Sequence, residues 1–118
     1  RKELIREALH QQLCNGFDVC EIHSEYGMTE LLSQAYSKGD GIYKCPSWMK
    51  ILIRDIYEPT KILNTNTTGG INVIDLANID SCCFIATQDL GKKINKAQFK
   101  ILGRFDNSDL RGCNLLIN

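Results

Sequence analysis

The stretch Ile71-Asn72-Val73-Ile74-Asp75-Leu76 alternates apolar and polar side chains, which is the pattern of a half-buried β-strand. A polar loop rich in Asn, Thr and Gly precedes it at residues 64–70. On either side of this segment the sequence predicts further short strands, at residues 49–57, 84–87 and 99–102. This succession of strands predicts a small, mostly antiparallel sheet or partial barrel over residues 41–118.

The first third of the chain has a different pattern. Apolar residues recur at helical spacing in residues 1–15, and Gly16 is a natural stop for that helix. Residues 19–22 are typical of a short strand. Thr29 is placed to cap a second helix over residues 30–37, before a turn at Gly39-Asp40-Gly41. The predicted fold is therefore α+β, with a helix–strand–helix unit in residues 1–40 and the β-rich part after it.

Length and charge exclude several classes of protein. The chain has 118 residues, enough for one domain, and its 14 Lys and Arg balance 14 Asp and Glu to a net charge of zero. This balance excludes the broad basic surface of a nucleic-acid-binding protein. No apolar run approaches the roughly 18 residues of a membrane span. We expect a cytoplasmic protein.

Both ends of the sequence suggest a piece of a larger protein. It starts at Arg1 without an initiator Met, and it ends in the apolar run of residues 115–117. Apolar surface left open in such a piece would favour dimerisation or strand exchange.

The cysteine pattern argues against both disulfides and zinc. The count is even, but nothing else in the sequence is typical of a secreted protein, so all six are expected to be reduced: Cys14, Cys20, Cys45, Cys82, Cys83 and Cys113. The sequence has no Cys-x-x-Cys, and Cys20-x-x-His23 is a single half-motif. His10 and His23 are interpreted as structural, with an assisting role for His23 as the alternative because it adjoins residues 24–30.

The first candidate ligand-binding segment is residues 24–30, Ser-Glu-Tyr-Gly-Met-Thr-Glu. Tyr26 offers an aromatic face for a planar base, and Gly27 lets the backbone approach a ligand closely. A hydroxyl such as that of Thr29 at a helix N-terminus suits a phosphate, and the carboxylate of Glu30 suits Mg²⁺. The alternative is an ordinary turn with a capping threonine and an acidic first turn.

Two further segments place polar residues after predicted strands. In Thr87-Gln88-Asp89-Leu90-Gly91, Asp89 is suited to accept hydrogen bonds from two ribose hydroxyls. In residues 103–113, Arg104 is suited to a phosphate or a ribose. Taken singly, each segment is equally compatible with turn chemistry.

The three segments together resemble the adenylate-forming enzyme superfamily, which contains the acyl-CoA synthetases. The matching strings are Tyr-Gly-Met-Thr-Glu at 26–30, Thr-x-Asp-x-Gly at 87–91 and Gly-Arg-x-Asp at 103–106, in this order. Within the superfamily, residues 23–37 and 110–116 are most similar to the acyl-protein synthetases, the LuxE family.

This resemblance implies ATP-dependent activation of a carboxylic acid, here a fatty acid, as an acyl-adenylate, followed by transfer to a thiol. It implies ATP and Mg²⁺ as cofactors and an acyl-acceptor protein as a partner. The implied roles are adenine binding by Tyr26 with Gly27 beside it, phosphate binding by Thr29, Mg²⁺ binding by Glu30, ribose binding by Asp89, ribose or phosphate binding by Arg104, and the hinge at Asp106.

The resemblance also implies that Cys113 is the nucleophile that takes the acyl group as a thioester, because the acyl-protein synthetases use a cysteine near the C-terminus. A thiolate is a suitable nucleophile, and Arg104 and Arg111 would lower the thiol pKa. The alternative is that Cys113 is a small apolar residue in a terminal strand.

Two parts of the superfamily pattern are absent from the sequence. The Ser/Thr/Gly-rich phosphate loop does not precede the first motif, and residues 65–70, which look similar, are interpreted as a hairpin loop. The domain with the catalytic lysine is also absent. We therefore expect a C-terminal fragment that holds the adenine, ribose and Mg²⁺ part and is inactive alone. The alternatives are a phenylacetate-type acyl-CoA ligase and a non-catalytic interaction module.

Overall fold

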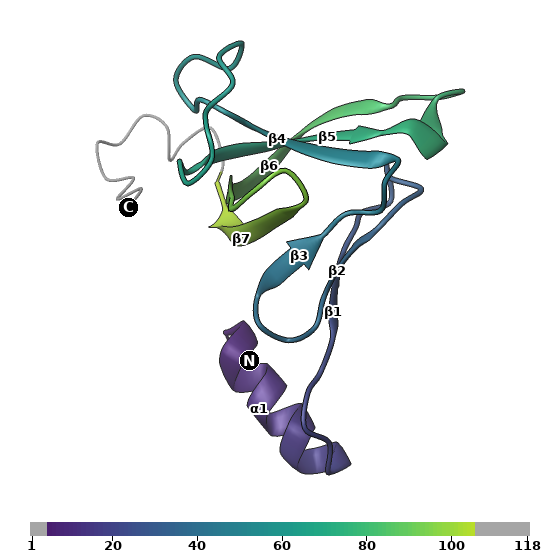
Figure 1. The fold of residues 1–118 in the computed structure, drawn as a ribbon, viewed down its shortest axis with the longest axis vertical. Coiled ribbons are helices and arrows are strands. Elements are labelled where there is room, and N and C mark those ends of the chain that lie inside the picture. Colours follow the sequence, from purple (N-terminus) through teal and green to yellow (C-terminus); the bar gives the residue numbers. More distant parts are fainter. Residues whose placement is uncertain (1–4, 106–118) are drawn as a thin grey trace.

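The structure is a computed structural model that describes residues 5–105. Its strands form one antiparallel sheet of seven in the order β1-β2-β3-β7-β6-β5-β4. Figure 1 shows this sheet with the single α-helix of the described residues beside one end. The elements are α1 (Arg6–Phe17), β1 (Ser24–Tyr26), β2 (Ala35–Ser37), β3 (Ile42–Lys44), β4 (Met49–Arg54), β5 (Gly69–Asp75), the 3-10 helix η1 (Leu76–Asn78), β6 (Phe84–Lys93) and β7 (Gln98–Arg104).

The strands predicted in the second half of the sequence are confirmed, with different bounds. β6 and β7 are longer than predicted, β5 begins two residues earlier and ends one residue earlier, and β4 ends at Arg54, three residues before the predicted end. β4 and β5 pair so that Ile51 lies opposite Val73 and Ile53 opposite Ile71, and these side chains are all buried. β6 extends six residues beyond the predicted end, as far as Lys93, because it pairs first with β5 and then with β7. The sequence pattern predicts strands well here because one side of each strand faces the core.

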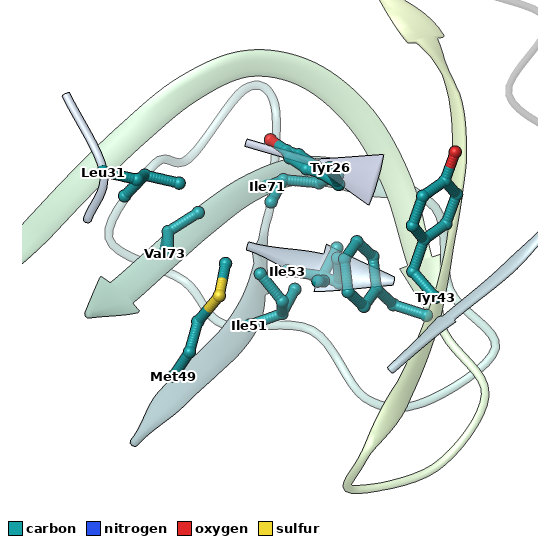
Figure 2. Packing of buried hydrophobic residues seen from close by; sticks show 10 residues of the cluster. Tyr26, Leu31, Tyr43, Met49, Ile51, Ile53, Ile71 and Val73 are labelled. Atoms are coloured by element: carbon teal, nitrogen blue, oxygen red, sulfur yellow. The ribbon is translucent and has the colours of Figure 1, made fainter. Parts of the chain in front are cut away.

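The core lies mainly on one face of β4, β5 and β7. Figure 2 shows the isoleucine and valine side chains of β4 and β5 gathered between Leu31 and Met49 on one side and the rings of Tyr26 and Tyr43 on the other. The buried hydrophobic cluster comprises Tyr26, Leu31, Ala35, Tyr43, Met49, Ile51, Ile53, Ile71, Val73 and Phe99. The first third of the chain therefore completes the core of the second and does not form a separate unit.

The helix predicted over residues 30–37 is wrong. Turns lead from Thr29 into β2, whose Tyr36 pairs with Glu25 of β1. Leu31, Ser33, Ala35 and Ser37 are buried while the residues between them are more exposed, which is the period of a strand. Apolar residues at both helical and alternating spacing made the local pattern ambiguous, and pairing with β1 decided it.

The short strand predicted at residues 19–22 also lies elsewhere. Residues 19–23 have no regular structure, and the strand begins at Ser24. The predicted first helix is present as α1 but continues one residue past Gly16, and Asp18 ends it in the left-handed conformation, with the N–H of Val19 bonded to the carbonyl of Cys14 at 3.0 Å. The α+β class is confirmed. Within the described residues the sheet is open, with β1 and β4 at its edges.

A substitution at Gly91 tests how closely β6 packs against its neighbouring strands. An added Cβ would lie 2.5 Å from the backbone oxygen of Lys100 and 2.7 Å from Cδ1 of Ile71. Gly91→Ala is therefore expected to lower the free energy of unfolding by about 2 kcal/mol in chemical denaturation. Gly16→Ala is the matched control, because nothing lies within 4 Å of its added Cβ. Equal effects of the two substitutions would contradict the pairing.

Candidate functional site

A cleft of about 490 Å³ lies between the loop after β1, the middle of β6 and the end of β7. Its lining includes five of the residues that the sequence motifs singled out: Gly27, Thr29, Glu30, Asp89 and Arg104. The remaining lining residues are Met28, Ile85, Ala86, Thr87 and Gln88. Folding thus brings the three motifs, which are far apart in the sequence, to one cleft.

Asp89 lies at the centre of the polar contacts in this cleft. Its Oδ2 accepts a hydrogen bond of 2.6 Å from the Tyr26 hydroxyl, and its Oδ1 is 3.5 Å from Nε of Arg104. Asp89 and Arg104 are paired residues on β6 and β7, which accounts for their proximity despite the separation in sequence. The Asp89 side chain is 18% exposed and that of Arg104 is 77% exposed, so the arginine contributes little to stability through this ion pair.

Tyr26 is a core residue at the edge of this site. Its ring packs edge-on against Tyr43 and Phe99, with centroid distances of 6.4 and 5.7 Å. Burial, and then the hydrogen bond to Asp89, raise the Tyr26 pKa well above its usual value, so the hydroxyl remains a donor. In this structure Tyr26 therefore orients the Asp89 carboxylate, a contact that its sequence motif did not reveal. Its packing on adenine stays a prediction.

Thr87 and Arg54 fix the backbone beneath Asp89. The Thr87 hydroxyl donates to the carbonyl of Ile71 at 2.9 Å and accepts from the N–H of Asp89 at 3.1 Å. Arg54 donates to the carbonyls of Thr87 and Ile71 and to Oδ1 of Asn72, and so joins three strands. Thr87 belongs to the Thr-x-Asp-x-Gly motif, whereas Arg54 carries no local sequence signal because its partners lie on other strands.

Thr29 and Glu30 line the cleft from the loop after β1, and both are exposed. The backbone carbonyl of Glu30 accepts a hydrogen bond of 2.8 Å from the side-chain amide of Asn78, which holds the turn. Within residues 5–105 no group of three or more His, Cys, Asp or Glu side chains is arranged for a metal ion. A single carboxylate such as Glu30 suits Mg²⁺ that arrives with phosphate oxygens as its other ligands.

The remaining predicted residues lie away from the cleft or beyond the described chain. Asp106 and Cys113 lie outside residues 5–105. His10 is bonded to Ser24 at 2.8 Å, and His23 is paired with Glu21 at 3.0 Å on the surface. The described cysteines are free thiols, and burial raises the pKa of Cys45 to about 11.

No model of a known protein family matches the sequence, and no curated protein matches it. A solved structure, the ATP-bound RpMatB-BxBclM chimera B3, matches 83% of this chain with a TM-score of 0.61 and 20% identity. This chain therefore shares the fold of part of that structure. The matched part is 23% of the chimera's chain, and the likeness is one of fold. No helix in the described part of the chain is long and apolar enough to cross a membrane.

The bond between Tyr26 and Asp89 gives a prediction for alkaline pH. The neutral phenol is favoured in the folded protein, so its contribution to stability is complete below pH 10 and is lost as the pH rises further. Tyr26→Phe is expected to lower the free energy of unfolding by about 1.5 kcal/mol at neutral pH. The difference in unfolding free energy from the wild-type protein should shrink above pH 10. A constant difference over this range would contradict the burial of the hydroxyl.

Proposed function

We propose that this chain is the adenine-, ribose- and Mg²⁺-binding part of an ATP-dependent acid–thiol ligase. The observation that carries the proposal is the meeting of the three motifs at one cleft, with the Asp89 carboxylate bonded to Tyr26 and beside Arg104. The fold likeness to an ATP-bound protein supports ATP as the nucleotide.

Each side chain of the cleft has a chemical task in this proposal. Asp89 accepts hydrogen bonds from the ribose hydroxyls, and the exposed Arg104 leaves its weak ion pair to bind ribose or phosphate. Thr29 donates its hydroxyl to a phosphate oxygen, and Glu30 binds the Mg²⁺ that accompanies the phosphates. Mg²⁺ neutralises the charge that develops on the phosphate during adenylation.

The reaction we propose has two steps. A carboxylate oxygen of a fatty acid forms a bond to the α-phosphorus of ATP and pyrophosphate leaves. A cysteine thiolate then forms a thioester with the acyl carbon and AMP leaves. We assign the thiol to Cys113 on the sequence resemblance, with an acyl-acceptor protein as the subsequent partner.

Nucleotide binding is tested by titration calorimetry of the chain with ATP at varied Mg²⁺ concentration. Binding is expected, and Glu30→Gln should weaken it by about tenfold with Mg²⁺ present while leaving binding of adenosine, which has no phosphate, unchanged. Glu25→Gln is the matched control, because Glu25 is exposed on β1 and does not line the cleft. Absence of ATP binding at every Mg²⁺ concentration would favour the non-catalytic interaction module.

Acyl transfer is tested by mass spectrometry after incubation of the full-length protein with ATP, Mg²⁺ and a fatty acid. An acyl adduct on Cys113, lost in Cys113→Ser, is the expected result. An acylated coenzyme A product with unmodified protein would instead support the phenylacetate-type ligase. ATP–pyrophosphate exchange by the 118-residue chain alone would contradict the expectation that it is inactive by itself.

A further inference from the structure

Asp75, the last residue of β5, is a carboxylate that is completely buried. Its Oδ2 accepts hydrogen bonds from the backbone N–H groups of Leu32 at 3.0 Å and Ser33 at 2.9 Å. Its Oδ1 accepts from the Ser33 hydroxyl at 2.7 Å and from the N–H of Ala77 at 3.2 Å. Burying a charged carboxylate costs free energy unless hydrogen bonds replace its contacts with water, and these four hydrogen bonds offset that cost.

Trp48 bonds to Ser33, and Asn78 bonds to the same turn of the chain at Glu30. The indole Nε1 of Trp48 donates to the Ser33 hydroxyl oxygen at 2.8 Å, so this hydroxyl both donates and accepts. Asn78 donates to the carbonyls of Glu30 and Cys82 at 2.8 and 3.0 Å. We call Asp75, Ser33, Trp48 and Asn78 the Asp75 cluster.

The Asp75 cluster acts on one short segment, the turn that leads from Thr29 to Ser33. This turn begins three residues after the end of β1 at Tyr26 and carries the exposed Thr29 and Glu30 side chains of the cleft. Its last residues are bonded to Asp75, and its Glu30 carbonyl to Asn78. Two sides of the turn are thus attached to the end of β5 and to η1, while the side chains of Thr29 and Glu30 remain free of this network.

On this basis, and on the proposed function, we infer that Asp75, Ser33 and Trp48 are positioning residues that hold Thr29 and Glu30 for the phosphates and Mg²⁺ of ATP. None of the three lines the cleft. They act through the backbone of the turn, as partners behind a metal ligand commonly do. The ribose contacts come from Asp89, on a different strand, and do not depend on the turn.

Because Thr29 and Glu30 are assigned to the phosphates and Asp89 to the ribose, we predict different effects on the binding of ATP and of adenosine. A purely structural role would not produce this difference. Loosening the turn should weaken binding of ATP with Mg²⁺, because Thr29 and Glu30 contact only the phosphates and the ion. It should leave binding of adenosine unchanged, because adenosine has no phosphate. General destabilisation of the fold would lower both affinities in parallel.

The test uses Ser33→Ala and Trp48→Phe, two mild substitutions, in the full chain. Ser33→Ala removes the hydroxyl and its bonds to Asp75 and Trp48, while the bond from the Ser33 backbone N–H to Asp75 remains. Trp48→Phe removes the indole donor and keeps an aromatic ring in a half-exposed side chain. Ser47→Ala is the matched control, because Ser47 is an exposed serine that does not line the cleft. Each protein is titrated with ATP plus Mg²⁺ and with adenosine at a temperature where it is fully folded, and amide hydrogen exchange is followed at Leu32.

We expect Ser33→Ala to raise the Kd for ATP with Mg²⁺ about tenfold, with a smaller rise in Trp48→Phe. The Kd for adenosine should stay within about twofold in both, and exchange at Leu32 should accelerate in both but not in Ser47→Ala. Unchanged ATP affinity, or equal loss for ATP and adenosine, would overturn the positioning role. A wild-type chain that binds adenosine but shows no Mg²⁺-dependent ATP binding would instead refute the proposed function on which it rests.

Discussion

Replacement of Asp89 by alanine is expected to reduce the affinity for ATP by about a hundredfold. In the proposed function the carboxylate accepts two ribose hydroxyls, and hydrogen bonds to a charged group contribute about 1.5 kcal/mol or more each. Their joint loss, near 3 kcal/mol, corresponds to about two orders of magnitude in Kd. The substitution also leaves the buried Tyr26 hydroxyl without its 2.6 Å acceptor.

Titration calorimetry with ATP and with adenosine measures this loss, and both ligands should lose affinity because both carry the ribose. Asp80→Ala is the matched control, since Asp80 is an exposed carboxylate that does not line the cleft. The affinity of Asp89→Asn should lie between those of the wild-type protein and Asp89→Ala, because the amide keeps one acceptor oxygen. Wild-type affinity in Asp89→Ala would refute the assignment of the ribose site.

Replacement of Asp75 by alanine is expected to have the largest effect on stability. The substitution leaves three backbone N–H donors and the Ser33 hydroxyl without their acceptor in a buried site. Each orphaned donor costs about 1 kcal/mol or more, so a loss of about 3–4 kcal/mol is expected, a large part of the stability of a small domain. Chemical denaturation followed by circular dichroism measures it.

The same residue gives a pH dependence. Burial alone would raise the Asp75 pKa, but the bonds from Ser33 and from the neighbouring N–H groups lower it below its usual value. The contribution of the ionised Asp75 carboxylate to the free energy of unfolding is therefore complete above the unfolded-state pKa of about 3.9. It is lost as the pH falls through the folded-state pKa. Asp75→Asn should lose this acid sensitivity. Asp80→Asn is the control, because Asp80 is exposed. An identical acid profile in both variants would contradict the role of the hydrogen bonds to Asp75.

The strands of the second half could be predicted because their signal is local. In β4 and β5 every second residue faces the core, so the apolar alternation at Ile51, Ile53, Ile71 and Val73 is visible in the sequence. The sequence also predicted which residue types would be available to bind a ligand at the cleft. The motifs whose chemistry suits a nucleotide supply the lining residues Gly27, Thr29, Glu30, Asp89 and Arg104, and also Tyr26, which lies beside the cleft and bonds to Asp89.

The segment after Thr29 was not predictable in the same way. Leu31, Leu32, Ala35 and Tyr36 satisfy a helical spacing, and the turn was decided by partners far away in the sequence. Asp75 lies more than forty residues from Ser33, yet its carboxylate accepts hydrogen bonds from the N–H groups of Leu32 and Ser33, and these bonds compete with the helical conformation of the segment. Residue types and spacing could not reveal this competition.

By itself, then, the sequence determined the β-strands with a buried face and the chemical groups available to a ligand, because both depend on side chains a few residues apart. Only the tertiary structure decided that β1 to β3 join the same sheet, that Asp89 lies between Tyr26 and Arg104, and that Asp75 holds the turn bearing Glu30. The physical reason is that strand register and buried hydrogen bonds join groups distant in the chain, and their free energy depends on the whole fold.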